Sequence, residues 1–125
     1  MSSSPTIQDI QEARDRLKPH VRHTPLIRAE GIEKAVGCQL YLKPETLQIT
    51  GAFKIRGALN KSLSLPREAV AKGLIATSSG NHAQGLAYAA RMLGVKATLV
   101  VPVGTPKIKV AKTRALGAEV VLFDG

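Results

Sequence analysis

A lysine lies between two bulky apolar residues in the stretch 51–58 (GAFKIRGA), with a glycine three residues to either side. The preceding segment, 43–51, has neither helical nor strand periodicity, so we predict a loop and then a helix that begins near Ala52 or Phe53. Lys54 would lie in the first helical turn, where the helix dipole and desolvation by apolar neighbours both disfavour an ammonium group. The neutral amine is the form that attacks a carbonyl carbon. Taken alone, this stretch leaves open an ordinary surface lysine.

A second polar stretch, 78–85 (SSGNHAQG), follows the apolar run 74–77 and precedes a predicted helix. Ligands of open α/β sheets bind outside the carboxyl ends of strands, and a helix N-terminus there offers free N–H groups to an anion. Hydroxyl, amide and imidazole side chains around such donors suit a carboxylate. The alternative is an ordinary capped turn, with Ser79 or Asn81 as the cap and Gly80 at positive φ. Neither a G-x-G-x-x-G pattern nor a P-loop occurs.

The composition is that of a soluble globular protein. With 125 residues, 44% hydrophobic and 22% charged, the chain is the size of one domain and can bury a core. Its net charge is +9, but the basic residues are spread along the chain without a run of five, and aromatic residues make up only 3%. A surface that stacks on nucleic-acid bases needs more aromatic side chains. We therefore expect no nucleic-acid partner.

The sequence also leads to expectations about the cellular location of the protein and about metal binding. No apolar run approaches the roughly 20 residues of a membrane span, and the N-terminal segment lacks the features of a secretory signal. We expect a cytoplasmic protein with no membrane partner. The single cysteine, Cys38, fits a reducing compartment and is expected to be a small buried residue. His20 and His23 lack nearby ligands that would complete a metal site, so we interpret both as loop or packing residues and expect no metal.

Caps and apolar periodicity predict the order of the elements. Thr6 and Asp9 have the spacing of a capping box. The expected helices cover residues 6–17, 30–36, 53–65, 67–72, 82–93 and 105–116, and the expected strands cover 26–28, 39–43, 74–77, 97–101 and 119–123. Because the last three strands alternate with helices through short connections, we expect them to be parallel, with right-handed crossovers and both faces covered.

The two stretches together resemble the fold-type II pyridoxal-phosphate enzymes, and most of all the threonine/serine dehydratase and serine racemase family. The resemblance extends over essentially the whole chain, including residues 24–26 and 112–120. It implies an α/β fold of the tryptophan synthase β type, with open parallel sheets and helices on both faces. Of its two domains, residues 1–65 would supply the N-terminal part of the large cofactor-binding domain. Residues 66–125 would begin the small domain, which carries the substrate loop.

The resemblance also implies the cofactor, pyridoxal 5'-phosphate, and roles for individual residues. Lys54 would form the Schiff base with the cofactor and later move the α-proton of the substrate, and Phe53 would pack against the cofactor ring. Asn81 would hydrogen-bond the phenolic oxygen of the ring. The substrate carboxylate would be held by Ser78, Asn81 and His82, largely through backbone N–H groups. Ser79 would be the base on the opposite face in a racemase, and it would also belong to the substrate loop.

Three functions follow from this resemblance. The first is a lyase that converts L-threonine or L-serine to a 2-oxo acid and ammonia, and the second is a serine racemase. The third is a non-catalytic fragment or interaction module, because family members are more than twice as long and their phosphate-binding loop would lie beyond Gly125. The full-length parent is expected to be a homo-oligomer, a dimer or tetramer, acting on a small amino acid.

Overall fold

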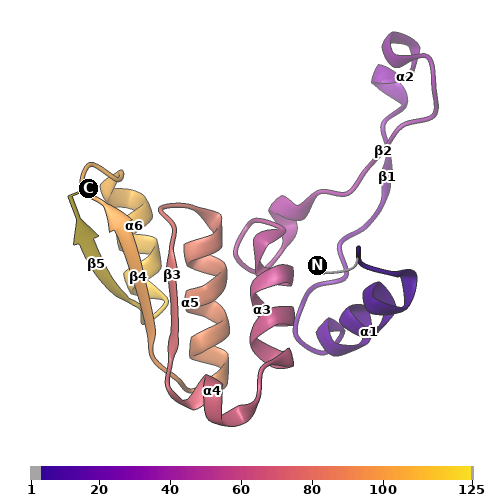
Figure 1. Ribbon diagram of the computed structural model, residues 1–125. Coiled ribbons are helices and arrows are strands. Elements are labelled where there is room, and N and C mark those ends of the chain that lie inside the picture. The colour runs from indigo at the N-terminus through magenta and orange to yellow at the C-terminus, as the bar shows by residue number, and fades with distance from the viewer. Residues whose placement is uncertain (1–3, 125) are drawn as a thin grey trace.

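The structure is a computed structural model that describes residues 4–124 (Figure 1). Its helices are α1 (Ile7–Leu17), α2 (Glu30–Val36), the 3-10 helix η1 (Glu45–Leu47), α3 (Lys54–Ser64), α4 (Arg67–Ala71), α5 (Asn81–Leu93) and α6 (Lys107–Ala115). Its strands are β1 (Ile27–Arg28), β2 (Tyr41–Leu42), β3 (Leu74–Thr77), β4 (Ala97–Pro102) and β5 (Glu119–Phe123). The predicted order of elements is confirmed, with boundaries that differ by a few residues at most.

Three parallel strands form the main sheet in the order β3–β4–β5. Leu74 lies opposite Ala97, and Thr98 lies opposite Glu119. The expected strand–helix–strand–helix–strand unit is therefore present, and the α/β fold class is confirmed. Helix α5 packs against β3 and β4, α6 packs against β5, and the two helices contact each other.

The layers continue beyond the sheet. Figure 1 shows α3 on the side of α5 away from the sheet, with α1 next to α3, and both helix pairs are in contact. One hydrophobic cluster joins these layers, and its largest fully buried side chains are Ile55, Leu59 and Leu99. On the sheet, Leu99 points into this core, whereas Ile75 of β3 is 72% exposed. Within residues 4–124, the face of the sheet that carries Ile75 is thus open, and the expected cover on both faces is not found there.

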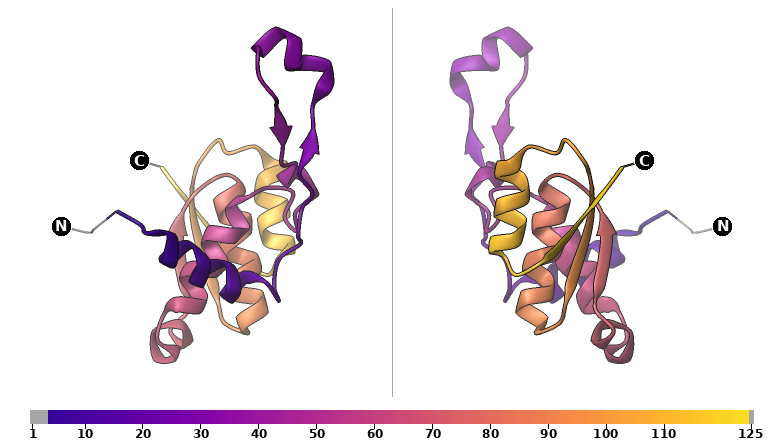
Figure 2. Two further views of the ribbon diagram at one scale, coloured as in Figure 1. Left: turned by 90° about the vertical axis from the view of Figure 1, so that its right-hand side faces the viewer. Right: turned by 90° about the vertical axis from the view of Figure 1, so that its left-hand side faces the viewer.

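A separate arm, residues 27–42, projects from this body (Figures 1 and 2). It consists of β1, α2 and β2, and the two short strands pair antiparallel, with Ile27 opposite Leu42. No residue of α2 is buried. Cys38 lies in the arm and is exposed, so the expectation of a buried cysteine was wrong. The reason is that the described part of the body does not pack over the arm.

Local signals set the helix ends. In the predicted capping box of α1, the Asp9 N–H donates to Thr6 Oγ1 at 3.2 Å, and the Thr6 N–H donates to Asp9 Oδ2 at 2.7 Å. Gly37 and Gly94 end α2 and α5 in the left-handed conformation, with φ of 71° and 69°.

The division of the chain into two domains between residues 65 and 66 stays a prediction. Among the residues described, no helix is long and apolar enough to cross a membrane.

Candidate functional site

Lys54 is the first residue of α3, one or two residues after the start near Ala52 or Phe53 expected from the sequence. Its side chain is exposed, and its Nζ lies 5.2 Å from the centroid of the Phe53 ring, which is itself 59% exposed. The predicted placement in a first helical turn is confirmed. The expected desolvation by apolar neighbours is not found within residues 4–124, because the lysine and the phenylalanine both face outward.

The second polar stretch lies between the end of β3 and the start of α5. The N-cap residue of α5 is Gly80, and no side chain caps this helix. The Gly80 N–H donates to Ser78 Oγ at 3.3 Å, which tightens the turn before the helix. Gly80 has a φ of −129°, so neither the expected positive φ nor a cap from Ser79 or Asn81 is present. The first-turn N–H groups of α5 therefore remain available to an anion.

A glycine brings the two stretches together. A Cβ atom added at Gly85 of α5 would lie 3.3 Å from the Cα and N atoms of Ile55 and from the carbonyl carbon of Lys54. The backbones of α3 and α5 thus meet at the start of α3. Since residues four apart lie on the same face of a helix, Asn81 is on the side of α5 that faces α3, one turn closer to its N-terminus than Gly85.

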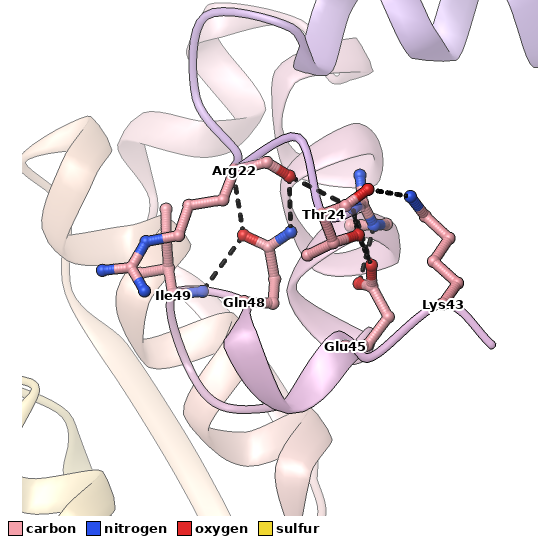
Figure 3. Close-up of polar contacts among 7 residues, drawn as sticks. Arg22, Thr24, Lys43, Glu45, Gln48 and Ile49 are labelled. Atoms are coloured by element: carbon pink, nitrogen blue, oxygen red, sulfur yellow. Dashed lines mark hydrogen bonds and ion pairs between the residues drawn. The ribbon is translucent and has the colours of Figure 1, made fainter. Parts of the chain in front are cut away.

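An ion pair ties η1, which precedes Lys54 in the chain, to α3, and hydrogen bonds tie both to the loop around Thr24. Glu45 of η1 accepts two hydrogen bonds from Arg56 of α3, from Nε and Nη2, both at 2.8 Å. Glu45 Oε1 also accepts from Thr24 Oγ1 at 2.6 Å (Figure 3). Thr24 is only 2% exposed, and its carbonyl oxygen accepts from Lys43 Nζ at 2.8 Å. These bonds join the loop around Thr24 to both η1 and α3.

This arrangement changes the acidity of both ionised partners. The hydrogen bonds from Arg56, supplemented by the bond from Thr24 and by the positive charges of Arg56 and Lys43, lower the pKa of Glu45 to about 2. The Glu45 carboxylate in turn raises the pKa of Arg56. The pair is therefore ionised at any pH at which the protein is expected to work.

A buried amide makes the second tie between the same segments. Gln48, 2% exposed, accepts at Oε1 from the backbone N–H groups of Arg22 and Ile49, at 2.9 and 3.0 Å. Its Nε2 donates to the carbonyl oxygen of Arg22 at 2.9 Å. Figure 3 shows Gln48 between Arg22 and Ile49. The amide thus satisfies backbone groups of both segments, as a neighbouring strand would.

Comparison with known proteins shows the family to which the chain belongs. A family model described as "Pyridoxal-phosphate dependent enzyme" matches residues 17–125. The chain belongs to this family. The family identifies the cofactor as pyridoxal 5'-phosphate and confirms the resemblance inferred from the two motifs.

Individual relatives narrow the position within the pyridoxal-phosphate dependent enzymes. The chain is 57% identical to an L-threonine ammonia-lyase of Geobacter sulfurreducens over 113 residues, which are 90% of this chain and 28% of that protein. It superposes on maize serine racemase with a TM-score of 0.92 and 39% identity, covering 98% of this chain and 37% of the racemase. For the threonine deaminase of T.th. the TM-score is 0.82 and the identity 51%, over 94% and 36% of the two chains. The chain thus spans well under half the length of these relatives.

The residues present fit this cofactor. An aldehyde needs an accessible primary amine, and the exposed side chain of Lys54 makes no hydrogen bond with the other described residues. A flat ring can stack on an exposed aromatic side chain, and Phe53 supplies one beside the amine. The uncapped start of α5 supplies donors for an anionic group on the same side. Residues 4–124 contain no cluster of His, Cys, Asp and Glu side chains that could hold a metal ion.

Sequence reasoning predicted the candidate chemical groups but missed the residues that hold their surroundings in place. Glu45 and Arg56 carry opposite charges but lie in separate elements, η1 and α3, so no periodic pattern within one helix joined them. The burial of Thr24 and Gln48 depends on the fold of the loops and has no signal in the local sequence. Gly85 is the last residue of the polar stretch 78–85, and a glycine inside a helix does indicate that another backbone approaches the helix closely there.

Proposed function

We propose that the protein containing this chain is a pyridoxal-phosphate-dependent lyase that removes water and then ammonia from L-threonine, L-serine or both. The products would be 2-oxobutyrate or pyruvate, together with ammonia. The observation that carries the proposal is the meeting of an exposed lysine at the start of α3 with an uncapped helix start at α5. The identity shared with an L-threonine ammonia-lyase supports the choice of substrate class.

Lys54 has two proposed tasks. Its amine would hold the cofactor covalently, and the same amine would accept the α-proton of the substrate. The cofactor, when bound, supplies an electron sink for the carbon that loses this proton. Phe53 offers its ring as a packing surface for the cofactor, beside the lysine Nζ. Both residues lie at the exposed end of α3, where a small molecule can reach them.

The turn before α5 has the task of orienting the substrate. The N–H groups at the start of α5 suit the substrate carboxylate, because they lack partners within the helix and lie at the positive end of its dipole. Ser78, Ser79, Asn81 and His82 line this turn, and we propose that they hold the carboxylate. Asn81 lies on the side of α5 that faces α3, so its amide is also a suitable partner for the phenolic oxygen of the cofactor.

The test uses the full-length protein with L-threonine and L-serine as substrates. We expect 2-oxo acid and ammonia to form in equal amounts, and we expect borohydride to trap the cofactor on Lys54, as detected by peptide mass spectrometry. Lys54→Ala should remove both signals. Lys61→Ala is the matched control, because Lys61 is an exposed lysine of the same helix. A Lys54→Ala protein that still produces 2-oxo acid at the wild-type rate would refute the proposal.

A serine racemase is the second candidate, favoured by the superposition on maize serine racemase. In that case Ser79, which is partly buried in the turn before α5, would carry the proton on the face opposite Lys54. With L-serine as substrate, D-serine and pyruvate are measured side by side. A racemase gives D-serine that disappears in Ser79→Ala, whereas a lyase without racemase activity gives pyruvate alone.

A further inference from the structure

Within the described chain the Lys54 side chain is exposed, lies over the Phe53 ring and makes no hydrogen bond or ion pair. In this part of the protein its direction therefore depends on how the residues that follow hold the start of α3. Successive side chains of an α-helix point about 100° apart around the axis. If two adjacent side chains are fixed in different directions, the rotation of the helix about its axis is fixed. The direction in which the preceding side chain, that of Lys54, leaves the helix is then fixed as well.

The first fixed direction is that of Ile55. This side chain has no exposed surface and belongs to the main hydrophobic cluster. Its backbone also lies against α5, at the point where Gly85 has no side chain. Ile55 therefore holds one side of the first turn of α3 against the core.

The second fixed direction is that of Arg56. Its guanidinium group donates two hydrogen bonds at 2.8 Å to the two oxygens of Glu45, and Nη2 also lies 3.3 Å from Thr24 Oγ1 and from the carbonyl oxygen of Arg22. A planar fork that meets a carboxylate in this way fixes orientation as well as distance. The Glu45 end is itself held, since Thr24 and Gln48 tie η1 to the loop at Arg22 (Figure 3).

We propose that Glu45 and Arg56 are positioning residues, which set the direction in which Lys54 leaves α3 without touching the substrate or the cofactor. The inference rests on the proposed role of Lys54 as the amine that attaches the cofactor. In that attachment the amine adds to the aldehyde carbon and one water molecule leaves, so the rate depends on how the amine is presented.

The chain contains a matched control for this pair. In the arm, Arg28 donates from Nε and Nη2 to the two oxygens of Glu33, both at 2.9 Å. Glu33 also accepts one further hydrogen bond, from the Leu40 N–H at 3.1 Å, just as Glu45 accepts one from Thr24. The chemistry of the two pairs is thus alike, but the arm projects away from α3 and α5 (Figure 1).

The experiment compares Glu45→Gln, Arg56→Lys and Glu33→Gln in the full-length protein. For each variant the thermal midpoint of the cofactor-free protein is measured first. Pyridoxal phosphate is then added at a temperature well below that midpoint, and the rate of attachment to Lys54 is followed by absorbance and by borohydride trapping. The circular dichroism of the bound cofactor band reports how the cofactor is oriented, which a loss of stability alone would not change.

We expect Glu45→Gln and Arg56→Lys to slow attachment by ~10- to 100-fold and to weaken the cofactor dichroism, as a misplaced reacting group would. Glu33→Gln should leave both at the wild-type level. Arg56→Lys keeps the positive charge and loses the fork, so it also serves as the gentler variant if Glu45→Gln does not fold. Wild-type rates and dichroism in Arg56→Lys would overturn the inference. Failure of the wild type to attach pyridoxal phosphate at Lys54 would instead overturn the proposed function.

Discussion

Replacement of Gly85 by alanine tests whether the close approach of α3 and α5 is what holds the two functional stretches together. The added Cβ atom would lie 3.3 Å from three atoms of the α3 backbone, two of Ile55 and one of Lys54. Favourable carbon–carbon contacts begin at about 3.5 Å. Since all three neighbours are backbone atoms, no side-chain rotation relieves the contact, and the two helices must move apart by a few tenths of an ångström.

Two effects of opposite sign set the change in stability. Alanine is favoured over glycine inside a helix by about 1 kcal/mol, whereas forcing an extra carbon into a packed interface costs about 1–3 kcal/mol. Gly85→Ala should therefore lie between neutral and about 2 kcal/mol less stable than the wild type. Gly57 of α3 has no atom within 4 Å of the corresponding Cβ position, so Gly57→Ala should keep the helix gain and become more stable by up to about 1 kcal/mol.

The assay is urea unfolding of the cofactor-free full-length protein, followed by circular dichroism, with the two alanine variants measured together. The expected result is that Gly85→Ala is less stable than Gly57→Ala by about 1–3 kcal/mol. Cofactor attachment to Lys54 should slow in Gly85→Ala, because the shift occurs at the backbone of Lys54 itself. Equal stabilisation by the two substitutions would show that the helices do not meet closely at Gly85, and the reasoning would fail.

Three further outcomes are expected. The bonds from Arg56 lower the pKa of Glu45 from an ordinary 4.5 to about 2, so its ionised form favours folding above pH 4.5, by about 1–2 kcal/mol once solvent screening of this partly exposed pair is included, and this contribution is lost as the pH falls towards 2. The difference in unfolding free energy between wild type and Glu45→Gln should accordingly narrow in acid, and a difference independent of pH would contradict this. Thr50 Oγ1 is buried without a hydrogen-bond partner among the described residues, so Thr50→Val should stabilise the cofactor-free protein by about 1 kcal/mol in urea unfolding, whereas a loss of stability would reveal a hidden partner. Residues 1–125 expressed alone should self-associate in sedimentation experiments, because Ile7 and Leu26 are 74% and 66% exposed and burying apolar surface is worth about 25 cal/mol per Å²; a monomer that melts cooperatively would refute this.

The sequence predicted those parts of the fold that depend on neighbouring residues. Thr6 and Asp9 form the expected capping box because both halves of that motif lie within one turn. The parallel strands followed from the alternation of apolar runs with helices, which leaves few arrangements open. The cofactor was implied by the resemblance of the two motifs to a known enzyme family, and the family match confirms it.

What the sequence could not supply depends on contacts between distant residues. The exposure of Cys38 follows from the direction in which the arm leaves the body, and no local pattern encodes that direction. The turn at Gly80 needed no positive φ, because the Ser78 hydroxyl accepts its N–H and closes the turn at a φ of −129°. The sequence likewise could not reveal that Lys54 is exposed, since its flanking residues Phe53 and Ile55 point in different directions.

This exposure explains why the supporting contacts lie where they do. In the proposed function an aldehyde must be able to reach Lys54, and among the described residues this side chain is exposed and not held by packing in the way that Ile55 is held. Its direction has to be set through the backbone, by neighbours that are themselves fixed. An apolar residue in the core and an arginine paired to Glu45 fix two successive directions at the start of α3, and Gly85 lets α5 approach that same turn. Substitutions at Glu45 or Gly85 should therefore change the chemistry at Lys54 although neither side chain reaches the reacting atoms.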